Sequence, residues 1–401
     1  MNRYLFTWEC GAGLGHLARY RQLIALLLER GHEVMFASRN LEAARTVYGE
    51  MPVKLVQAPI HQRQPVDMFK PNSYVDVLIN QGFEESDFKS RVQAWSDLFE
   101  TWRPAVVIAD HSPTVLLAQR LHKHTPCIVA GNGFSVPPVQ RPFPPFDAQS
   151  PVSREDLIQR EDNLLNAVVN PVLRELGGEP LEQCQQLFSP HIQWVFGLPR
   201  LDHYQCERKQ TYLGASPSMG GAAASWPDTP GPRVFLYVKN HPMTLHVLQT
   251  LKELRWSTLI YAPTWSEDLR RAAESPSLRL SAEPLDLQSV ARGCDLSVSN
   301  GGMNSVVELL LQGVPQLLLP LHIEQLMFAR AAQTTGAVLA LPLKWQKPNR
   351  FLHALEAAAD PAGALKKAAV EFSENHEADG LTVQVDELVA QLEAVQQANE
   401  R

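Results

Sequence analysis

Short apolar runs alternate with longer segments of helical periodicity along most of the chain. Near the N-terminus, the pattern predicts a strand over residues 4–7, an amphipathic helix over residues 17–29 and a second strand over residues 34–37. A comparable series of strands and helices begins at residue 234. Strands that alternate with helices build parallel sheets, so the pattern predicts an α/β protein with two such sheets.

The most informative pattern lies between residues 295 and 336. A short apolar run over residues 296–299 is followed by Gly301 and Gly302 and then by an apolar segment of helical length that ends at Gly313. A helix is therefore predicted to begin at the glycine pair. Its first backbone N–H groups are unpaired and carry the positive end of the helix dipole, and glycines let an anion approach closely. The sequence predicts a phosphate-binding turn here.

Polar residues around this helix extend the predicted site. Asn304 and Ser305 stand in the first turn, where their side chains are able to donate hydrogen bonds to the same anion. Glu308, one turn further on, is suited to accept paired hydroxyls such as those of a ribose. Glu324 and Gln325 follow the next predicted strand, at the carboxyl edge where open parallel sheets bind ligands. The unit is thus expected to meet a phosphate, a ribose and a further polyhydroxy group.

Glycines also follow the first predicted strand. Gly11, Gly13 and Gly15 form a flexible turn, and such spacing occurs in dinucleotide-binding proteins as well as in other phosphate-binding loops. The acidic residue expected at the end of the second strand of a dinucleotide fold is missing, because residues 38–40 are Ser-Arg-Asn. Arg39 leaves an NADP site as a weak alternative. Gly13 and Gly15 remain candidates for a phosphate loop.

His16 follows this turn and is the candidate general base. A neutral imidazole accepts a proton from a hydroxyl at neutral pH, although a histidine at a helix start often has no function. Residues 104–109 predict a buried parallel strand that ends at Asp110, on the same edge of the sheet as His16. A carboxylate there would orient the imidazole, whereas the competing interpretation makes Asp110 a helix cap before Pro113.

Length and composition limit the alternatives. A chain of 401 residues exceeds one ordinary core, which favours two domains. The formal net charge of −7, without a dense block of Lys or Arg, argues against a nucleic-acid polymer or an anionic membrane as partner. No apolar run reaches membrane-spanning length, and residues 1–9 do not have the pattern of a secretory signal. A small-molecule partner is therefore expected.

The cysteines and acidic residues give no metal pattern. The five cysteines are odd in number and contain no Cys-x-x-Cys pair, so they are expected to be reduced thiols in a cytoplasmic protein. The sequence contains neither His-Glu-x-x-His nor Asp-x-Asp, which favours a site without metal, and no cofactor is expected.

The expected domain organisation follows from composition. Residues 214–231 are rich in Gly, Ala, Ser and Pro and predict a linker between a first domain, residues 1–213, and a second domain, residues 232–376. Residues 377–401 predict a final amphipathic helix. Lys239 follows the first strand of the second domain, where it either approaches a phosphate group or belongs to a solvated loop.

The stretch that begins at Asn300 resembles the nucleotide-sugar-binding signature of family 1 glycosyltransferases. The signature is His-x-Gly-x-Asn-Ser-x-x-Glu followed by Pro and Asp/Glu-Gln, which corresponds here to residues 300–308, Pro320 and residues 324–325. The family's leading His, which contacts the donor phosphate, is Asn300 in this chain. An amide still donates a hydrogen bond but carries no charge.

The resemblance implies a GT-B fold, in which two Rossmann-like parallel-sheet domains face each other across a cleft, with the C-terminal helix packed back on the first domain. It also implies an inverting, metal-independent transfer of a sugar from a UDP- or dTDP-sugar to a hydroxyl of a small-molecule or lipid acceptor. The implied roles are catalysis for His16 and Asp110, diphosphate binding for Asn300, Gly301, Gly302, Asn304 and Ser305, ribose binding for Glu308, and donor-sugar binding for Glu324 and Gln325. Two alternatives remain: a non-catalytic nucleotide-sugar-binding partner protein and a sugar-nucleotide epimerase.

Overall fold

The computed structural model describes residues 1–11, 13–61, 70–189, 192–216, 220–342, 347–376 and 384–399. The chain forms two compact units. Unit 1 contains Met1–Phe196, Cys206–Leu213 and Val383–Arg401, and unit 2 contains Gly197–Gln205 and Gly214–Thr382.

Unit 1 is built on a six-stranded parallel sheet with the strand order β3-β2-β1-β4-β5-β6. The strands are β1 (Arg3–Trp8), β2 (Glu33–Ser38), β3 (Lys54–Gln57), β4 (Val106–Asp110), β5 (Cys127–Asn132) and β6 (Ile192–Phe196). The chain adds strands outward from β1 to β3 on one side and then from β4 to β6 on the other. The direction of winding therefore reverses between β1 and β4, which are neighbours in the sheet.

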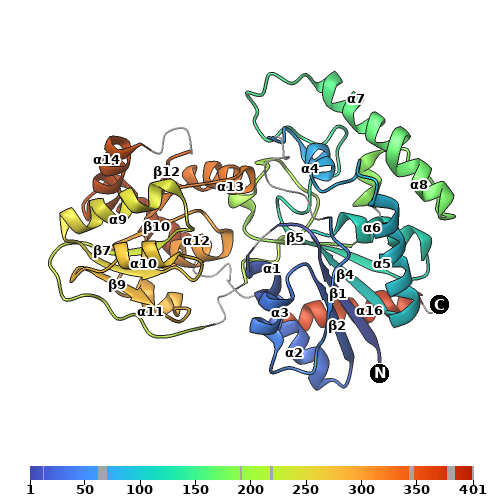
Figure 1. Ribbon diagram of the computed structural model, residues 1–401, viewed down its shortest axis with the longest axis horizontal. Coiled ribbons are helices and arrows are strands. Elements are labelled where there is room, and N and C mark those ends of the chain that lie inside the picture. The colour runs from blue at the N-terminus through green and yellow to red at the C-terminus, as the bar shows by residue number, and fades with distance from the viewer. Residues whose placement is uncertain are drawn as a thin grey trace. The chain divides into compact units, whose positions relative to one another are not determined.

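Helices cover both faces of this sheet (Figure 1). They are α1 (Gly15–Ala18), α2 (Arg21–Glu29), α3 (Leu41–Tyr48), α4 (Tyr74–Asn80), α5 (Phe88–Trp102), α6 (Pro113–Leu121), α7 (Arg154–Leu164), α8 (Asn170–Glu175) and α16 (Val385–Asn399). The prediction of one helix over residues 17–29 is wrong, since α1 and α2 are separate segments joined by a tighter turn in which the Tyr20 N–H bonds to the Leu17 carbonyl. The C-terminal helix α16, red in Figure 1, packs against α2 and β4.

Unit 2 repeats the same plan. Its parallel strands are β7 (Arg233–Tyr237), β8 (Ser257–Tyr261), β9 (Leu278–Ser281), β10 (Leu296–Ser299), β11 (Gln316–Leu318) and β12 (Val338–Ala340), in the order β12-β11-β10-β7-β8-β9. Its helices are α9 (Pro242–Leu254), α10 (Glu267–Ala272), α11 (Leu287–Ala291), α12 (Met303–Leu310), α13 (Ile323–Gln333), α14 (Pro348–Ala359) and α15 (Ala364–His376). Here the winding reverses between β7 and β10. The prediction of two parallel α/β sheets is confirmed.

The central strand β7 shows why this sheet is covered on both faces. Val234 and Leu236 point into one apolar cluster, and Phe235 points into a second cluster on the other side. All three side chains are buried. Since successive side chains of a strand point to opposite faces, an uninterrupted apolar run needs helices on both sides. The same holds for β4, whose five residues are all buried.

The path of the chain differs from the predicted domain ranges. Residues 197–205 lie in unit 2, although the sequence places them before the predicted linker. The described residues after 219 in that linker are also held by unit 2. Ala222 donates its N–H to Pro284 O, Ala224 donates its N–H to Ser289 Oγ, and Pro227 O accepts from Ser257 Oγ. Among the described residues, no helix is long and apolar enough to cross a membrane.

Candidate active site

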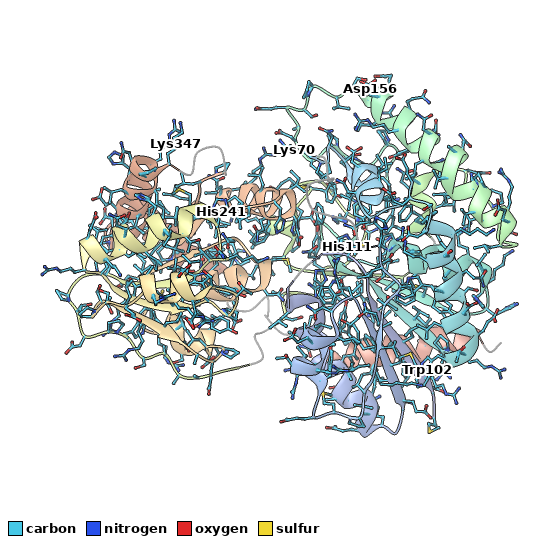
Figure 2. The ribbon with its side chains drawn as sticks, in the orientation of Figure 1. Lys70, Trp102, His111, Asp156, His241 and Lys347 are labelled. Atoms are coloured by element: carbon cyan, nitrogen blue, oxygen red, sulfur yellow. The ribbon has the colours of Figure 1, made fainter. Side chains whose placement is uncertain are left out.

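The histidine and the aspartate predicted as a catalytic pair lie together in unit 1. Asp110 is the last residue of β4, and His16 lies on the short helix α1 that follows β1. Because β1 and β4 are neighbours, their carboxyl ends bring the two side chains to the point where the winding reverses. His16 Nδ1 lies 2.8 Å from Asp110 Oδ1, and both side chains are buried. In Figure 2, His111, the next residue, marks this edge of the sheet, and Trp102, just before β4, lies toward the opposite edge.

Two further side chains from the same stretch also contact Asp110. Tyr20 donates its hydroxyl to Oδ2 over 2.8 Å, and a guanidinium nitrogen of Arg19 lies 3.6 Å from the same oxygen. Arg19 and Tyr20 follow His16 by three and four positions, in the tight turn between α1 and α2, and this turn brings all three side chains to one carboxylate. We did not predict these two residues, although their spacing from His16 was a usable signal.

The surroundings of Asp110 keep it ionised. Burial alone raises the pKa of its carboxyl, but Arg19 lowers it, followed by His16 and the hydrogen bond from Tyr20, so that the pKa lies below its ordinary value. An ionised carboxylate accepts a hydrogen bond from Nδ1–H of a neutral imidazole. This leaves the lone pair on Nε2 of His16 to accept a proton.

The glycine turn before His16 places Gly11 beside that nitrogen. Gly11 has a φ of +87°, and a Cβ there would lie 3.0 Å from His16 Nε2. Gly13 has a φ of +109°, but a Cβ there would meet no atom within 4 Å among the described residues. Gly15 is the first residue of α1, and its carbonyl accepts a hydrogen bond from Arg19 Nε. The Trp8 ring stacks beside His16 with centroids 5.2 Å apart.

A buried carboxyl group, that of Glu9, directly precedes the glycine turn in the chain. Glu9 directly follows β1, is 3% exposed, and accepts hydrogen bonds from the N–H and hydroxyl of Thr114 at the start of α6. Arg91 approaches it to 3.7 Å. Burial is the dominant influence and raises the pKa of Glu9 to about 7, although Thr114 and Arg91 lower it. Glu9 thus links β1 to α6 beside the candidate base.

The predicted glycine pair lies at the carboxyl edge of the unit 2 sheet. The helix α12 begins directly after it, with Gly302 as its N-cap. Gly301 has a φ of +84°, in the left-handed region, whereas Gly302 has an ordinary φ of −67°. Gly302 is exposed, and a Cβ there would meet no described atom within 4 Å. The first N–H groups of α12 are thus approachable, as an anion site requires.

The polar residues of α12 occupy different depths. Asn304 and Ser305 are partly exposed in the first turn. Asn304 Oδ1 is buried and has no hydrogen-bond partner among the described residues. Glu308, one turn later, is 2% exposed. The two predicted sugar-binding residues begin α13, where Gln325 Oε1 accepts the N–H of Leu321 and its amide nitrogen remains the group available to a ligand hydroxyl.

Comparison with known proteins finds a similar family for part of unit 2. Residues 296–389 match the family model described as UDP-glucoronosyl and UDP-glucosyl transferase. The chain is similar to this family over those residues, which make up less than half of its length. The predicted family resemblance is thereby confirmed. None of the curated proteins matches the chain by sequence.

Solved structures of glycosyltransferases share this fold. Glycosyltransferase VinC in complex with DTDP superposes with a TM-score of 0.68 at 18% identity, covering 99% of this chain and 100% of that one. The glycosyltransferase of kitacinnamycin gives 0.70 at 17% identity, covering 98% and 99%. SnogD from Streptomyces nogalater gives 0.61 at 17% identity, with the same shares covered.

Asn300 is held by backbone groups of two neighbouring strand ends. Its side chain is 7% exposed, and both ends of the amide are bonded to backbone: Oδ1 accepts the N–H of Lys239 over 2.7 Å, and Nδ2 donates to Leu319 O over 2.8 Å. Lys239 itself is exposed, two residues beyond the end of β7. No group of three or more His, Cys, Asp or Glu side chains suited to a metal ion occurs within the described parts of the chain.

Proposed function

We propose that this glycosyltransferase transfers a sugar from a UDP- or dTDP-sugar to a hydroxyl of a small-molecule or lipid acceptor, with inversion and without a metal ion. The observation that carries the proposal is the buried contact of 2.8 Å between His16 Nδ1 and Asp110 Oδ1. A histidine that is held by a carboxylate through one ring nitrogen, with a glycine beside the other, is arranged as a general base.

The reaction follows from that arrangement. His16 Nε2 takes the proton from the acceptor hydroxyl as its oxygen bonds to the anomeric carbon. The bond between that carbon and the phosphate oxygen breaks on the opposite face, so the configuration inverts and the nucleoside diphosphate leaves with the bonding electron pair. Asp110 stabilises the imidazolium that forms and remains ionised, since Arg19 and Tyr20 hold its pKa low.

The donor is assigned to unit 2. The N–H groups at Gly301, Gly302 and the first turn of α12, with Asn304 and Ser305, are proposed to bind the diphosphate. Glu308 is proposed to hold the ribose, and Glu324 and Gln325 the sugar hydroxyls. The structure of VinC in complex with DTDP supports a nucleoside diphosphate of this kind as the ligand.

Metal independence is part of the proposal. The sequence has no Asp-x-Asp pair to hold a metal on the diphosphate, and the N-terminus of α12 offers positive dipole charge instead. We also propose a reducing compartment such as the cytoplasm, because none of the five cysteines forms a disulfide among the described residues.

Calorimetric titration of the protein with UDP and with dTDP, in the presence of EDTA, tests the donor site. Binding of one nucleotide is expected, with loss of binding in Gly302→Trp, which fills the approach to α12, and in Glu308→Ala. The absence of binding by both nucleotides would contradict the proposal. Binding that requires added Mg²⁺ would contradict metal independence alone.

Product analysis separates transfer from the two alternatives. A transferase releases nucleoside diphosphate and forms a glycoside only when acceptor is present. Conversion of the nucleotide sugar without acceptor would indicate an epimerase. Tight nucleotide binding without any product, across an acceptor screen, would indicate a non-catalytic binding protein.

A further inference from the structure

The reversal point of the unit 2 sheet is where an open parallel sheet binds its ligand. There, the strands β7 and β10 are neighbours, with Ser299 opposite Tyr237. Lys239 follows the end of β7 by two residues, and Asn300 follows the end of β10 directly. The two residues are therefore the ones that the fold brings together at the ligand-binding edge.

Backbone groups hold both ends of the Asn300 amide at this edge. Its amide joins the backbone of Lys239, beyond β7, to that of Leu319, beyond β11. One amide thus ties the ends of three adjacent strands. The second N–H of Nδ2 is still able to donate, but backbone groups fix the orientation of the amide, and the side chain is only 7% exposed. Asn300, which stands at the position of the family's His, thus joins the ends of neighbouring strands.

Two further side chains hold the backbone around Lys239. Trp265 Nε1 donates to Val238 O over 2.8 Å, and Thr244 Oγ1 donates to Lys239 O over 2.9 Å. Together with Asn300, these bonds fix the carbonyl before Lys239 and both of its own backbone groups. The side chain is exposed, and among the described residues it has neither an ion pair nor a hydrogen bond. A fixed backbone thus presents a free ammonium group.

The two histidines near this edge, His241 and His322, do not supply a positive charge at neutral pH. Desolvation lowers the pKa of His241, whose Nδ1 accepts the N–H of Met243 at the start of α9. His322 precedes α13, and its pKa is lowered by desolvation, raised by Glu324 and lowered further by the charge of Lys239. Both imidazoles are therefore neutral at neutral pH. The effect on His322 also indicates that the positive charge of Lys239 lies near the start of α13.

We propose that Lys239 provides the charged contact to the diphosphate of the nucleotide-sugar donor, and that Asn300 is the positioning residue that holds Lys239 in place. The charge that the family supplies from the His position comes here from the neighbouring strand. This inference rests on the proposed function, because that assigns the donor to unit 2. An ammonium group is a suitable partner for phosphate oxygens as a point charge.

The first test compares Lys239→Met with Lys367→Met, an exposed lysine of α15 that serves as the matched control. Calorimetry with UDP and dTDP is expected to show binding that is about tenfold to a hundredfold weaker in Lys239→Met. The loss should be smaller for UMP and dTMP, and it should shrink at high ionic strength because salt screens an exposed charge. Equal affinities for wild type and Lys239→Met would overturn the inference while leaving the proposed function intact. If the wild type binds no nucleotide, the proposed function fails first.

The second test addresses Asn300 through a double-mutant cycle. Asn300→Ala is expected to weaken nucleoside diphosphate binding in the wild-type background and to have little further effect in the Lys239→Met background. An equal loss in both backgrounds would show that Asn300 acts independently of Lys239. Asn300→His provides a second readout: tighter binding would show that position 300 itself contacts the phosphate and would overturn the positioning role. Should the Asn300 variants fail to fold, Lys239→Met, which alters only an exposed side chain, still decides the main claim.

Discussion

The two units have the same strand order, but different groups join the strand ends at the point where the winding reverses. In unit 1 the ends of β1 and β4 meet through ionisable side chains, with Asp110 contacted by His16, Tyr20 and Arg19. In unit 2 the ends of β7 and β10 meet through the neutral amide of Asn300 and backbone groups. Proton transfer needs a polarised imidazole shielded from water, whereas anion binding needs accessible N–H groups and an accessible charge. Under the proposed function, the same edge of the fold would serve proton transfer in unit 1 and anion binding in unit 2.

Breaking the contact between His16 and Asp110 in unit 1 should have the largest effect. His16→Ala is expected to lower kcat by about 10²- to 10⁴-fold, because general-base catalysis contributes that much. Asp110→Asn keeps the shape of the side chain but removes the charge that orients the imidazole, so a similar loss is expected. Steady-state turnover with donor and acceptor measures both.

Nucleotide affinity is the control for these two variants, since unit 2 is unchanged in both. Full turnover in His16→Ala would refute the assignment of the base. A matching loss of nucleotide affinity would show instead that the substitution had disturbed the donor site.

The buried carboxyl of Glu9 should make unit 1 sensitive to pH. Its pKa of about 7 in the folded state exceeds the ordinary value of 4.5, so the folded state keeps a proton that the unfolded state releases between these values. The free energy of unfolding should therefore fall as pH rises from about 4.5 to 7, by up to about 3 kcal/mol. Glu9→Gln should remove that part of the pH dependence.

Urea unfolding at pH 5 and pH 8 measures this effect, with tryptophan fluorescence as the signal. Glu283→Gln, at an exposed position of unit 2, is the matched control and should leave the pH dependence unchanged. If Glu9→Gln and the wild type lose the same stability between the two pH values, the buried proton is not on Glu9.

Obstructing His16 without removing it sharpens the comparison further. Gly11→Ala and Gly13→Ala place the same methyl group at positive φ in one turn, but only the first lies 3.0 Å from His16 Nε2. Both are expected to strain the turn, and Gly11→Ala should reduce kcat by about a further hundredfold by displacing the base. Equal kcat values for the two variants would indicate that this nitrogen does not face the acceptor.

The smallest predicted effect concerns the glycine pair of unit 2. Gly301→Ala should cost about 1–2 kcal/mol of stability, because its φ of +84° is unfavourable for any residue with a Cβ. Gly302→Ala should be nearly neutral, since its φ is ordinary and the space around it is open. Denaturant midpoints of the two variants measure the difference. A larger loss for Gly302→Ala would mean that α12 begins elsewhere.

Much of this arrangement follows from sequence because it depends on local pattern. The apolar run before Asp110 predicts a buried strand, and parallel winding places its carboxyl end beside that of the first strand. The glycine pair predicts the start of α12 for similar reasons. Even the contacts of Arg19 and Tyr20 follow from their spacing after His16, once the aspartate is known to lie there.

The contacts of Asn300 have no such local origin. Its partners lie 61 and 19 residues away along the chain, and they meet only because β7, β10 and β11 are neighbours. The sequence motif therefore predicts the position of Asn300 but not the groups that its side chain contacts. The same limit applies to residues 197–205, whose place in unit 2 depends on long-range packing against α13 and not on composition.

The placement of residues 197–205 in unit 2 has a practical consequence for exchanging domains between related proteins. A hybrid joined at residue 213 would take residues 197–205 from the wrong parent, and with them Gly197, whose missing Cβ makes room for Met303 of α12. The final helix α16 would also be inherited with the second half although it packs on the first. A hybrid that keeps both native interfaces needs junctions near residues 196, 205, 213 and 382. The gene for such a hybrid would be a mosaic of five pieces.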